Sequence, residues 1–245
     1  SPPPNGRFVV RNDSAMVLRS GRVVVPGVRY GFEPPRAEAG VPLYSDDEGE
    51  TWLAGSTLFV DSDKAQNDPD FGWDEWNLIE LKDGRLLALV RTTFGCFFHA
   101  HSRDQGESWS RPVPTDLPAD QAPCLLRRLP NSGNLLVFWT QASVDERERF
   151  LTRHRLSCAI SRDDGVTWEK FKNLESLDGV SRVSPPTAIR VVKPNVEKYP
   201  QAAHGYHQPL NRERYYKAPG VLRCAYPTCA FIGDHAVITY GYGSK

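Results

Sequence analysis

"SDDEGETW", residues Ser45–Trp52, is a short polar stretch that ends in a large aromatic side chain. The pattern Ser-x-Asp-x-Gly-x-(Thr/Ser)-Trp returns as "SRDQGESW" at Ser102–Trp109 and as "SRDDGVTW" at Ser161–Trp168. The three boxes start 102 − 45 = 57 and 161 − 102 = 59 residues apart. A regular spacing of this length indicates that one supersecondary unit recurs along the chain.

A second pattern runs in phase with the boxes and predicts β-hairpins. A glycine in a polar turn precedes an apolar run at Leu18–Arg29, Leu81–Thr92 and Leu129–Thr140, and more loosely at Phe231–Tyr242. Such turns between apolar runs are typical of hairpins. Each unit is therefore expected to hold two hairpins, that is, four antiparallel strands. Because one small sheet cannot bury both of its faces alone, radial stacking of such sheets predicts an all-β fold, a β-propeller with four-stranded antiparallel blades.

The residue types of the box suit a tight turn. Its aspartate can accept backbone N–H groups, and its glycine can take a positive φ at low steric cost. The tryptophans are expected to bury their rings between neighbouring strands. Three equivalent turns on three different blades cannot converge on one site, and each box offers too few oxygen ligands for calcium. The boxes are therefore expected to be structural.

Charge and cysteine content argue against several classes of function. The 30 basic and 30 acidic side chains balance, so no basic surface predicts a nucleic-acid partner. No apolar run reaches the roughly 18 residues that a membrane span needs. The five cysteines contain no CxxC pair and are expected to be buried free thiols rather than a disulfide framework or a zinc site. We expect no metal and no other cofactor.

The repeated box resembles the Asp-box, or bacterial neuraminidase repeat, of the sialidase-like superfamily. The resemblance covers about residues 6–180 and 221–245. It implies part of a six-bladed propeller and an exo-glycosidase that hydrolyses terminal α-linked sialic acid or a related carboxylate-bearing sugar, so that the partner would be a sialylated or other acidic glycan. Asp-boxes also occur in other propellers, and a fold does not fix a reaction. A non-catalytic glycan-binding propeller and an enzyme acting on a uronate-containing glycan stay open.

Three segments carry the resemblance at the level of single residues. "DEWNLIELKDGRLLALVRT" (Asp74–Thr92) is similar to the sialidase stretch that supplies a glutamate and an arginine, which implies Glu75 and Arg91. "CAYPTCAF" (Cys224–Phe231) resembles the final-blade motif and implies Tyr226 as the nucleophile.

The third segment leaves a choice between two arginines. "RHRLSCAISRDDGVTW" (Arg153–Trp168) resembles the family's next arginine motif and places Arg153 on the arginine that binds the substrate carboxylate. Arg155 stands where the family usually has proline, so the sequence leaves the choice between the two open.

The chemistry explains these residue types. Sialic acid carries a carboxylate on its anomeric carbon, and arginine forks bind carboxylates through two parallel hydrogen bonds. That anion would repel a carboxylate nucleophile, and sialidases use a tyrosine instead. Because a phenol has a pKa near 10, it needs a neighbouring base such as glutamate.

The in-phase spacing adds three pocket candidates. Asn12 lies nine residues before Gly21, as Glu75 does before Gly84. Asn12 or its neighbour Asp13 is therefore expected to face the same pocket as a substrate-binding residue. Arg29 nearly matches Arg91 in the same comparison and is expected there as a substrate-binding residue.

Residues 1–245 are expected to form one sialidase-like propeller domain of about three and a half blades. The family's N-terminal arginine motif and the acid/base aspartate that follows it are not found, so we expect a missing N-terminal portion of the same propeller. A long connection at about residues 180–220 also departs from the family. Its histidines, arginines and tyrosines, among them His204, His207 and Tyr206, are expected either to cover a sheet edge or to grip a glycan.

Overall fold

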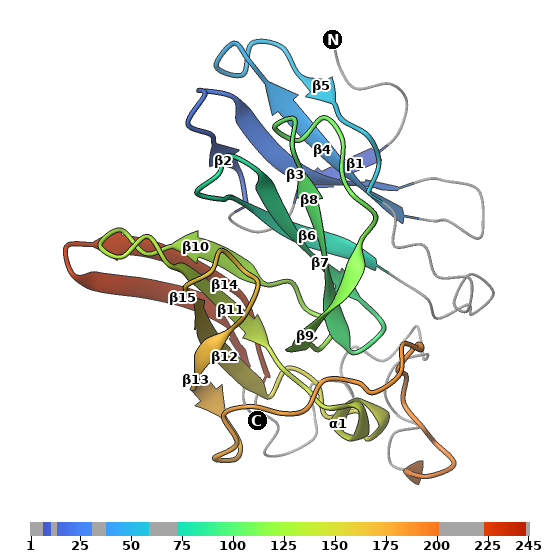
Figure 1. Cartoon of the computed structure of the whole chain (residues 1–245). Coiled ribbons are helices and arrows are strands. Elements are labelled where there is room, and N and C mark those ends of the chain that lie inside the picture. Colours follow the sequence, from blue (N-terminus) through green and yellow to red (C-terminus); the bar gives the residue numbers. More distant parts are fainter. Residues whose placement is uncertain (1–6, 11–13, 31–37, 59–72, 201–222, 244–245) are drawn as a thin grey trace.

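The computed structural model describes residues 7–10, 14–30, 38–58, 73–200 and 223–243, which fold mainly into antiparallel β-sheets (Figure 1). The first sheet contains β1 (Arg7–Val10), β2 (Met16–Val17), β3 (Val23–Tyr30), β4 (Glu38–Ser45) and β5 (Leu53–Ala54). Its strand order is β1-β3-β4-β5, and the short β2 pairs with β3.

The second and third sheets are four-stranded and antiparallel, as predicted. The second contains β6 (Trp73–Glu80), β7 (Leu86–Thr92), β8 (Cys96–Ser102) and β9 (Val113–Pro118). The third contains β10 (Leu125–Arg128), β11 (Leu135–Thr140), β12 (Arg155–Ser161) and β13 (Glu169–Ser176), with the short helix α1 (Val144–Glu148) between β11 and β12. A hairpin of β14 (Arg223–Ile232) and β15 (His235–Gly243) forms a fourth sheet of two strands.

Strand β7 shows how the sheets pack. Its successive side chains point to opposite faces, as in any strand. Leu86 and Val90 belong to the apolar core shared with the first sheet, whereas Leu87 and Leu89 belong to the core shared with the third. All four are at most 2% exposed. The near-continuous apolar run of this strand therefore reflects burial on both faces.

The same packing continues to the last hairpin. Leu136 and Phe138 of β11 form the next core together with Cys229 of β14. The four sheets thus stack face to face in sequence order, and within the described residues they do not close into a ring (Figure 1).

The Asp-boxes form the tight turns that their residue types predict. Asp47 accepts hydrogen bonds from the Thr51 backbone N–H at 2.8 Å and from the Ser45 hydroxyl at 2.8 Å. The Ser45 hydroxyl in turn accepts the Gly49 N–H at 2.8 Å, and Gly49 has φ +94°. The hydrogen bonds that Asp47 accepts lower its pKa to about 2, and the bond from the Thr51 hydroxyl has the largest effect. The other two boxes repeat these bonds.

The expectation that the box tryptophans bury their rings is confirmed for Trp168 and met only in part by the other two. Trp168 is 7% exposed and packs between the second and third sheets. Trp52 and Trp109 are only half-buried, and each indole N–H donates back to the glycine carbonyl of its own box. Trp52 thus mainly closes its own turn, whereas Trp109 also packs against the core between the first and second sheets, with its ring edge-on to Trp76 at a centroid distance of 5.4 Å.

The described part of the long connection links two sheets. Gln141, just after β11, donates to the Ser181 carbonyl at 2.7 Å and accepts the Val183 N–H at 3.2 Å. Further on, the Val192 N–H donates to the Thr93 carbonyl, between β7 and β8, at 2.9 Å. The connection thus runs from the third sheet to the second. The predicted histidines and tyrosines at positions 204–216 lie outside the described residues.

Two expectations from composition can be compared with the structure. All five cysteines are free thiols, four of them buried and Cys158 half-buried, in agreement with the prediction. Burial raises the pKa of the Cys124 thiol to about 12. None of the helical structure in the described residues is long and apolar enough to cross a membrane.

Substitution of a box glycine should report on the packing between sheets. Gly165 and Gly49 occupy the same box position with φ +92° and +94°, so alanine strains the backbone equally at both. A Cβ at Gly165 would also lie 2.6 Å from Cδ2 of the buried Leu87 in the second sheet, whereas the nearest atom at Gly49 is 3.7 Å away. We expect Gly165→Ala to lower the free energy of unfolding by about 1–3 kcal/mol more than Gly49→Ala, measured by urea denaturation. Equal losses would contradict the tight contact between these sheets.

Candidate active site

Tyr226 and Glu75, which are 226 − 75 = 151 residues apart, meet in the structure. The Tyr226 hydroxyl donates a hydrogen bond to Glu75 Oε1 at 2.9 Å. Glu75 lies on β6 with a side chain only 1% exposed, and Tyr226 lies half-buried on β14. The contact therefore joins the second sheet to the fourth.

Both residues lie where their strands are irregular. The pairing of β6 with β7 shifts register between Trp73 and Trp76, and that of β14 with β15 shifts between Ala225 and Thr228. Tyr226 itself has φ +58°, which is uncommon for a residue other than glycine. Bulges of this kind redirect side chains and are frequent beside active sites. They explain how two strand residues can point toward each other instead of into a sheet core.

Arg91, at the end of β7, pairs with the second oxygen of the same carboxylate. Its Nη1 donates to Glu75 Oε2, and its side chain is 15% exposed. Glu75 is thus held between a guanidinium group and a phenol. The pairing also places Arg91 within reach of a ligand bound at Tyr226.

Arg153, in the loop that precedes β12 of the third sheet, completes the group. Its guanidinium carbon lies 5.5 Å from the centre of the Tyr226 ring, and its Nη2 donates to the Gln121 carbonyl at 3.0 Å. A cation over an aromatic face at this distance is favourable. The structure thus brings together Glu75 and Arg91 of the second sheet, Tyr226 of the fourth, and Arg153 of the loop before β12.

The charges of these four side chains favour an anionic ligand. Burial raises the pKa of Tyr226, and the charge of Glu75 and its hydrogen bond raise it further, against the opposing effect of the two arginines. The phenol is therefore neutral at neutral pH. The guanidinium groups of Arg91 and Arg153 beside this neutral phenol are donors that suit a carboxylate ligand.

The remaining predicted pocket residues do not all fall within this group. Asn12 and Asp13 lie outside the described residues. Arg29 lies half-buried on β3, two residues after Gly27, whose carbonyl accepts the indole N–H of Trp76 at 2.9 Å. Arg29 therefore lies on the strand that packs beside β6, and its role in substrate binding stays a prediction.

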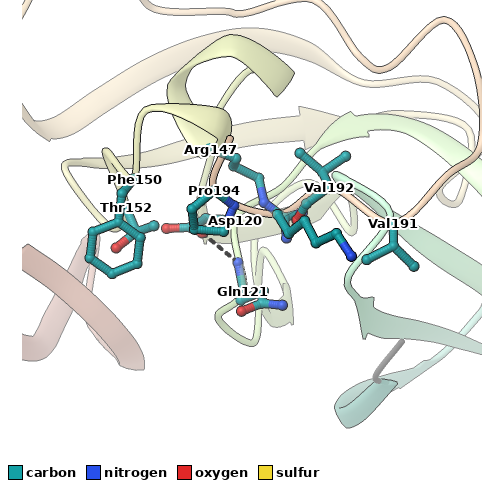
Figure 2. Close-up of a pocket in the computed structure, with 9 residues that line it drawn as sticks. Asp120, Gln121, Arg147, Phe150, Thr152, Val191, Val192 and Pro194 are labelled. Atoms are coloured by element: carbon teal, nitrogen blue, oxygen red, sulfur yellow. Dashed lines mark hydrogen bonds between the residues drawn. The ribbon is translucent and has the colours of Figure 1, made fainter. Parts of the chain in front are cut away.

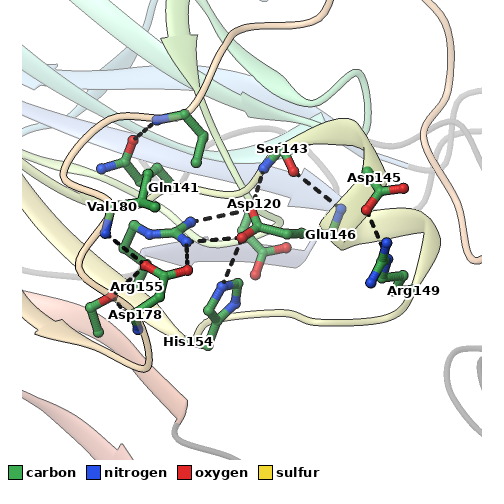
Figure 3. A network of polar contacts seen from close by, with 12 residues as sticks. Asp120, Gln141, Ser143, Asp145, Glu146, Arg149, His154, Arg155, Asp178 and Val180 are labelled. Atoms are coloured by element: carbon green, nitrogen blue, oxygen red, sulfur yellow. Dashed lines mark hydrogen bonds and ion pairs between the residues drawn. The ribbon is translucent and has the colours of Figure 1, made fainter.

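Arg155, the alternative to Arg153, has a different environment. Its side chain is 1% exposed and donates to Glu146 at 2.9 Å and to Asp178 at 2.6 Å (Figure 3). His154 lies beside the same glutamate, with its Nε2 3.2 Å from Glu146 Oε1. Arg155 thus ties α1 and the chain after β13 to the third sheet, and Arg153 is the arginine at Tyr226.

Glu146, His154 and Asp178 are the group of described residues whose ligand atoms lie close enough together to hold a metal ion. Both carboxylates already accept hydrogen bonds from the Arg155 guanidinium. A cation bound there would have to displace this buried arginine, which supplies the positive charge that the carboxylates need. The arrangement fits a buried ion-pair network better than a metal site.

Two residues near Tyr226 were not anticipated from the sequence. Asp120 and Gln121 follow β9, contact Arg153, and line a pocket beside α1 together with Phe150, Thr152 and the segment 191–194 (Figure 2). The pocket holds about 350 Å³ of empty space, part of it open to solvent. No spacing or motif marks "ADQ" (Ala119–Gln121) as part of a site, because its role depends on contact with a residue more than thirty positions away.

The fold and the site define an all-β protein of stacked antiparallel sheets with a Tyr–Glu pair and two arginines gathered from different sheets. The chain belongs to the BNR repeat-like domain family, which it matches over residues 4–231, within the sialidase-like superfamily.

Individual relatives agree with this assignment over part of their length. The chain is 33% identical over 144 residues to a sialidase of Micromonospora viridifaciens, in an alignment that covers 54% of this chain and 19% of the relative. It is 30% identical over 132 residues to an anhydrosialidase of Macrobdella decora, covering 47% of this chain and 16% of the relative. The aligned regions thus span less than a fifth of either relative.

Solved structures support the fold. Trypanosoma rangeli sialidase in complex with sialic acid matches 97% of this chain and 30% of its own with a TM-score of 0.59 at 14% identity. A protein of unknown function from Dyadobacter fermentans matches 71% of this chain and 44% of its own with a TM-score of 0.53 at 19% identity. At these identities the likeness concerns architecture alone.

Removal of the Glu75 charge should make Tyr226 more acidic. Since the charge of Glu75 and its hydrogen bond raise the pKa of Tyr226, Glu75→Gln should lower it. The measurement is the ultraviolet absorbance of tyrosinate against pH, taken as the difference between each protein and the same protein carrying Tyr226→Phe.

A second Tyr–Glu pair provides the control. The Tyr240 hydroxyl donates to Glu175 at 2.5 Å, and this bond is the main reason why the pKa of Tyr240 rises to about 12. Glu175→Gln should lower the pKa of Tyr240 and leave Tyr226 unchanged. If Glu75→Gln left the titration of Tyr226 where it was, the two side chains would not be in contact in solution.

Proposed function

We propose that this chain carries the nucleophile and the carboxylate-binding arginines of a sialidase-like exo-glycosidase that hydrolyses terminal α-linked sialic acid or a related carboxylate-bearing sugar. The observation that carries the proposal is the 2.9 Å hydrogen bond from Tyr226 to Glu75, with Arg91 and Arg153 beside it. The sialidase relatives support the same reaction class.

In the proposed first step, Tyr226 attacks the anomeric carbon of the sugar. Glu75 takes the phenol proton as the new bond from Tyr226 Oη forms, so that no free phenolate has to build up. The glycosidic bond breaks at the same carbon, and its oxygen leaves with a proton from an acid outside the four residues of the site. Water then attacks the same carbon and passes its proton to the group that protonated the leaving oxygen in the first step. The tyrosyl–sugar bond breaks, and the phenol regains its proton from Glu75.

Arg91 and Arg153 serve the carboxylate of the sugar in this scheme. Guanidinium groups bind a carboxylate with charge-assisted hydrogen bonds and keep their charge at any pH of interest. The sugar carboxylate lies on the reacting carbon, so holding it also places that carbon against Tyr226. Because a neutral phenol is not repelled by the bound anion, tyrosine suits this position better than a carboxylate nucleophile.

The two alternative functions would each use only some of the four residues of the site. A non-catalytic glycan-binding propeller needs the arginines but has no need for a tyrosine hydrogen-bonded to a buried carboxylate. An enzyme acting on a uronate-containing glycan would use the arginines with other acid and base groups. The Tyr226–Glu75 contact favours the sialidase-like reaction over both.

The activity test compares two tyrosines that both donate to a glutamate. The complete protein is assayed for release of a chromophore from an α-sialoside, and Tyr226→Phe is expected to reduce kcat by about 10³-fold or more because the nucleophile is lost. Tyr240→Phe removes the hydrogen bond to Glu175 and should leave kcat within about twofold.

Each other outcome has a distinct meaning. Full activity of Tyr226→Phe would eliminate the proposed nucleophile. If the unchanged protein released no sugar from any sialoside but bound the glycan, the protein would be a non-catalytic glycan-binding propeller. Release of sugar from a uronate-containing glycan instead would show that the enzyme acts on that class of glycan.

We further propose that residues 1–245 form one domain and that its sheets belong to a six-bladed propeller completed by a further portion of the same propeller. The family resemblance supports this arrangement, as do the exposed apolar side chains on the outer face of the last hairpin: Ile232 is 66% exposed and Val237 46%. Apolar side chains gathered on one sheet are usually covered in the working protein.

Cysteine labelling tests the completed ring. In the complete protein, Val237→Cys should react with a maleimide much more slowly than Val166→Cys, because Val166 lies on an Asp-box turn with 78% exposure and needs no covering sheet. Equal rates of labelling would mean that no further part of the protein covers β15.

A further inference from the structure

Arg153 and Tyr226 share an unusual backbone conformation. Each has φ +58°, in the left-handed region that side chains other than glycine rarely adopt. Such conformations persist only where surrounding contacts enforce them, and they are concentrated at functional sites. The contacts that hold Arg153 are therefore part of how the site is built.

Asp120 provides the main contact to the Arg153 backbone. One carboxylate oxygen of Asp120 accepts the Arg153 N–H, and the other accepts the Gln121 N–H at 2.6 Å. Asp120 is 1% exposed, and its own N–H donates to the Thr140 carbonyl at the end of β11 at 3.0 Å. The backbone of the residue that carries this carboxylate is thus hydrogen-bonded to the third sheet.

The next residue fixes the other end of the arginine. The Gln121 carbonyl accepts a hydrogen bond from Arg153 Nη2 at 3.0 Å. Residues 120 and 121 therefore hold both the backbone and the guanidinium group of Arg153. Figure 2 shows Asp120 and Gln121 side by side at the pocket that adjoins α1.

Arg153 is also hydrogen-bonded to β14, the strand that carries Tyr226. The Arg153 carbonyl accepts the Cys224 N–H at 2.7 Å, two residues before Tyr226 on β14. Asp120 is thereby connected to Tyr226 through a single residue, Arg153, whose N–H and carbonyl are both engaged.

We propose that Asp120 is a positioning residue: its buried carboxylate holds Arg153 in the left-handed conformation that places the guanidinium group against Tyr226 and anchors the start of β14. This inference rests on the proposed function for its effect on substrate, but the geometry that it describes can be tested without any activity. In the working enzyme, loss of Asp120 would let Arg153 turn away, so that the substrate carboxylate loses one of its two cations.

The test is a double-mutant cycle in the complete protein with Asp120→Asn and Arg153→Gly. Asparagine leaves one acceptor oxygen where the aspartate uses two, so it can no longer hold both N–H groups. Glycine adopts a positive φ without help, so a chain with Arg153→Gly no longer needs Asp120 for this purpose. Asp116→Asn is the control, since Asp116 is exposed and pairs with Arg182 at 3.2 Å.

The first readout is the titration of Tyr226, followed by tyrosinate absorbance against Tyr226→Phe. Arg153 lowers the pKa of this phenol, so Asp120→Asn should raise it as the guanidinium withdraws. In the Arg153→Gly background the same substitution should leave it unchanged. Asp116→Asn should have no effect in either background.

The second readout is steady-state kinetics on an α-sialoside. Asp120→Asn should raise KM by about tenfold, the effect of losing one charge-assisted contact, with a smaller change in kcat. A general loss of stability would lower the amount of active enzyme without raising KM.

Each outcome decides the proposal. A shifted Tyr226 titration that disappears with Arg153→Gly supports it, whether or not the protein cleaves sialosides. An unchanged titration in Asp120→Asn, or the same shift in both backgrounds, overturns it. If Asp120→Asn alone does not fold, recovery of folding with Arg153→Gly supports the proposal and failure to recover overturns it. Loss of the proposed function alone would appear as absent activity with the titration cycle intact.

Discussion

The structure depends on the burial of both faces of each inner strand. In β7, Leu86 and Val90 face one neighbouring sheet while Leu87 and Leu89 face the other, and all four are essentially inaccessible to water. Such a strand is stable only when a sheet lies on each side of it, so the sheets must stack in series. The Asp-box turns serve this stacking, because a turn glycine such as Gly165 lies directly against Leu87 of the sheet before it.

This stacking brings the ends of different strands together. Glu75 comes from the second sheet, Arg153 from the loop that leads into the third and Tyr226 from the fourth, and Tyr226 contacts both of the others. Irregular backbone at these positions then directs the side chains toward one another. The bulges on β6 and β14, and the left-handed backbones of Arg153 and Tyr226, turn side chains out of the sheet cores. A regular strand would have directed them to one of the two buried faces.

The electrostatics of the group follow from its burial. The carboxylate of Glu75 has a side chain that is 1% exposed, and an ion so placed needs a partner. Arg91 supplies the charge and Tyr226 supplies a hydrogen bond. The same carboxylate keeps the phenol neutral, since its negative charge and its hydrogen bond both oppose ionisation. A neutral phenol beside two arginines is the combination that the proposed reaction on an anionic sugar requires.

By itself, the sequence determined the repeating unit, the hairpins, the box turns and, through resemblance, the residue types of the site. These are properties of short segments, set by turn chemistry and by the alternation of apolar side chains. Which of Arg153 and Arg155 lies beside Tyr226, and the place of Asp120, were decided only by the tertiary structure. Positions 153 and 155 would share one face in a regular strand, but Arg153 precedes β12 in a left-handed conformation and Arg155 lies within the strand. That conformation is held by a carboxylate thirty-three positions away, and no local pattern reveals a contact that exists only after the chain has folded.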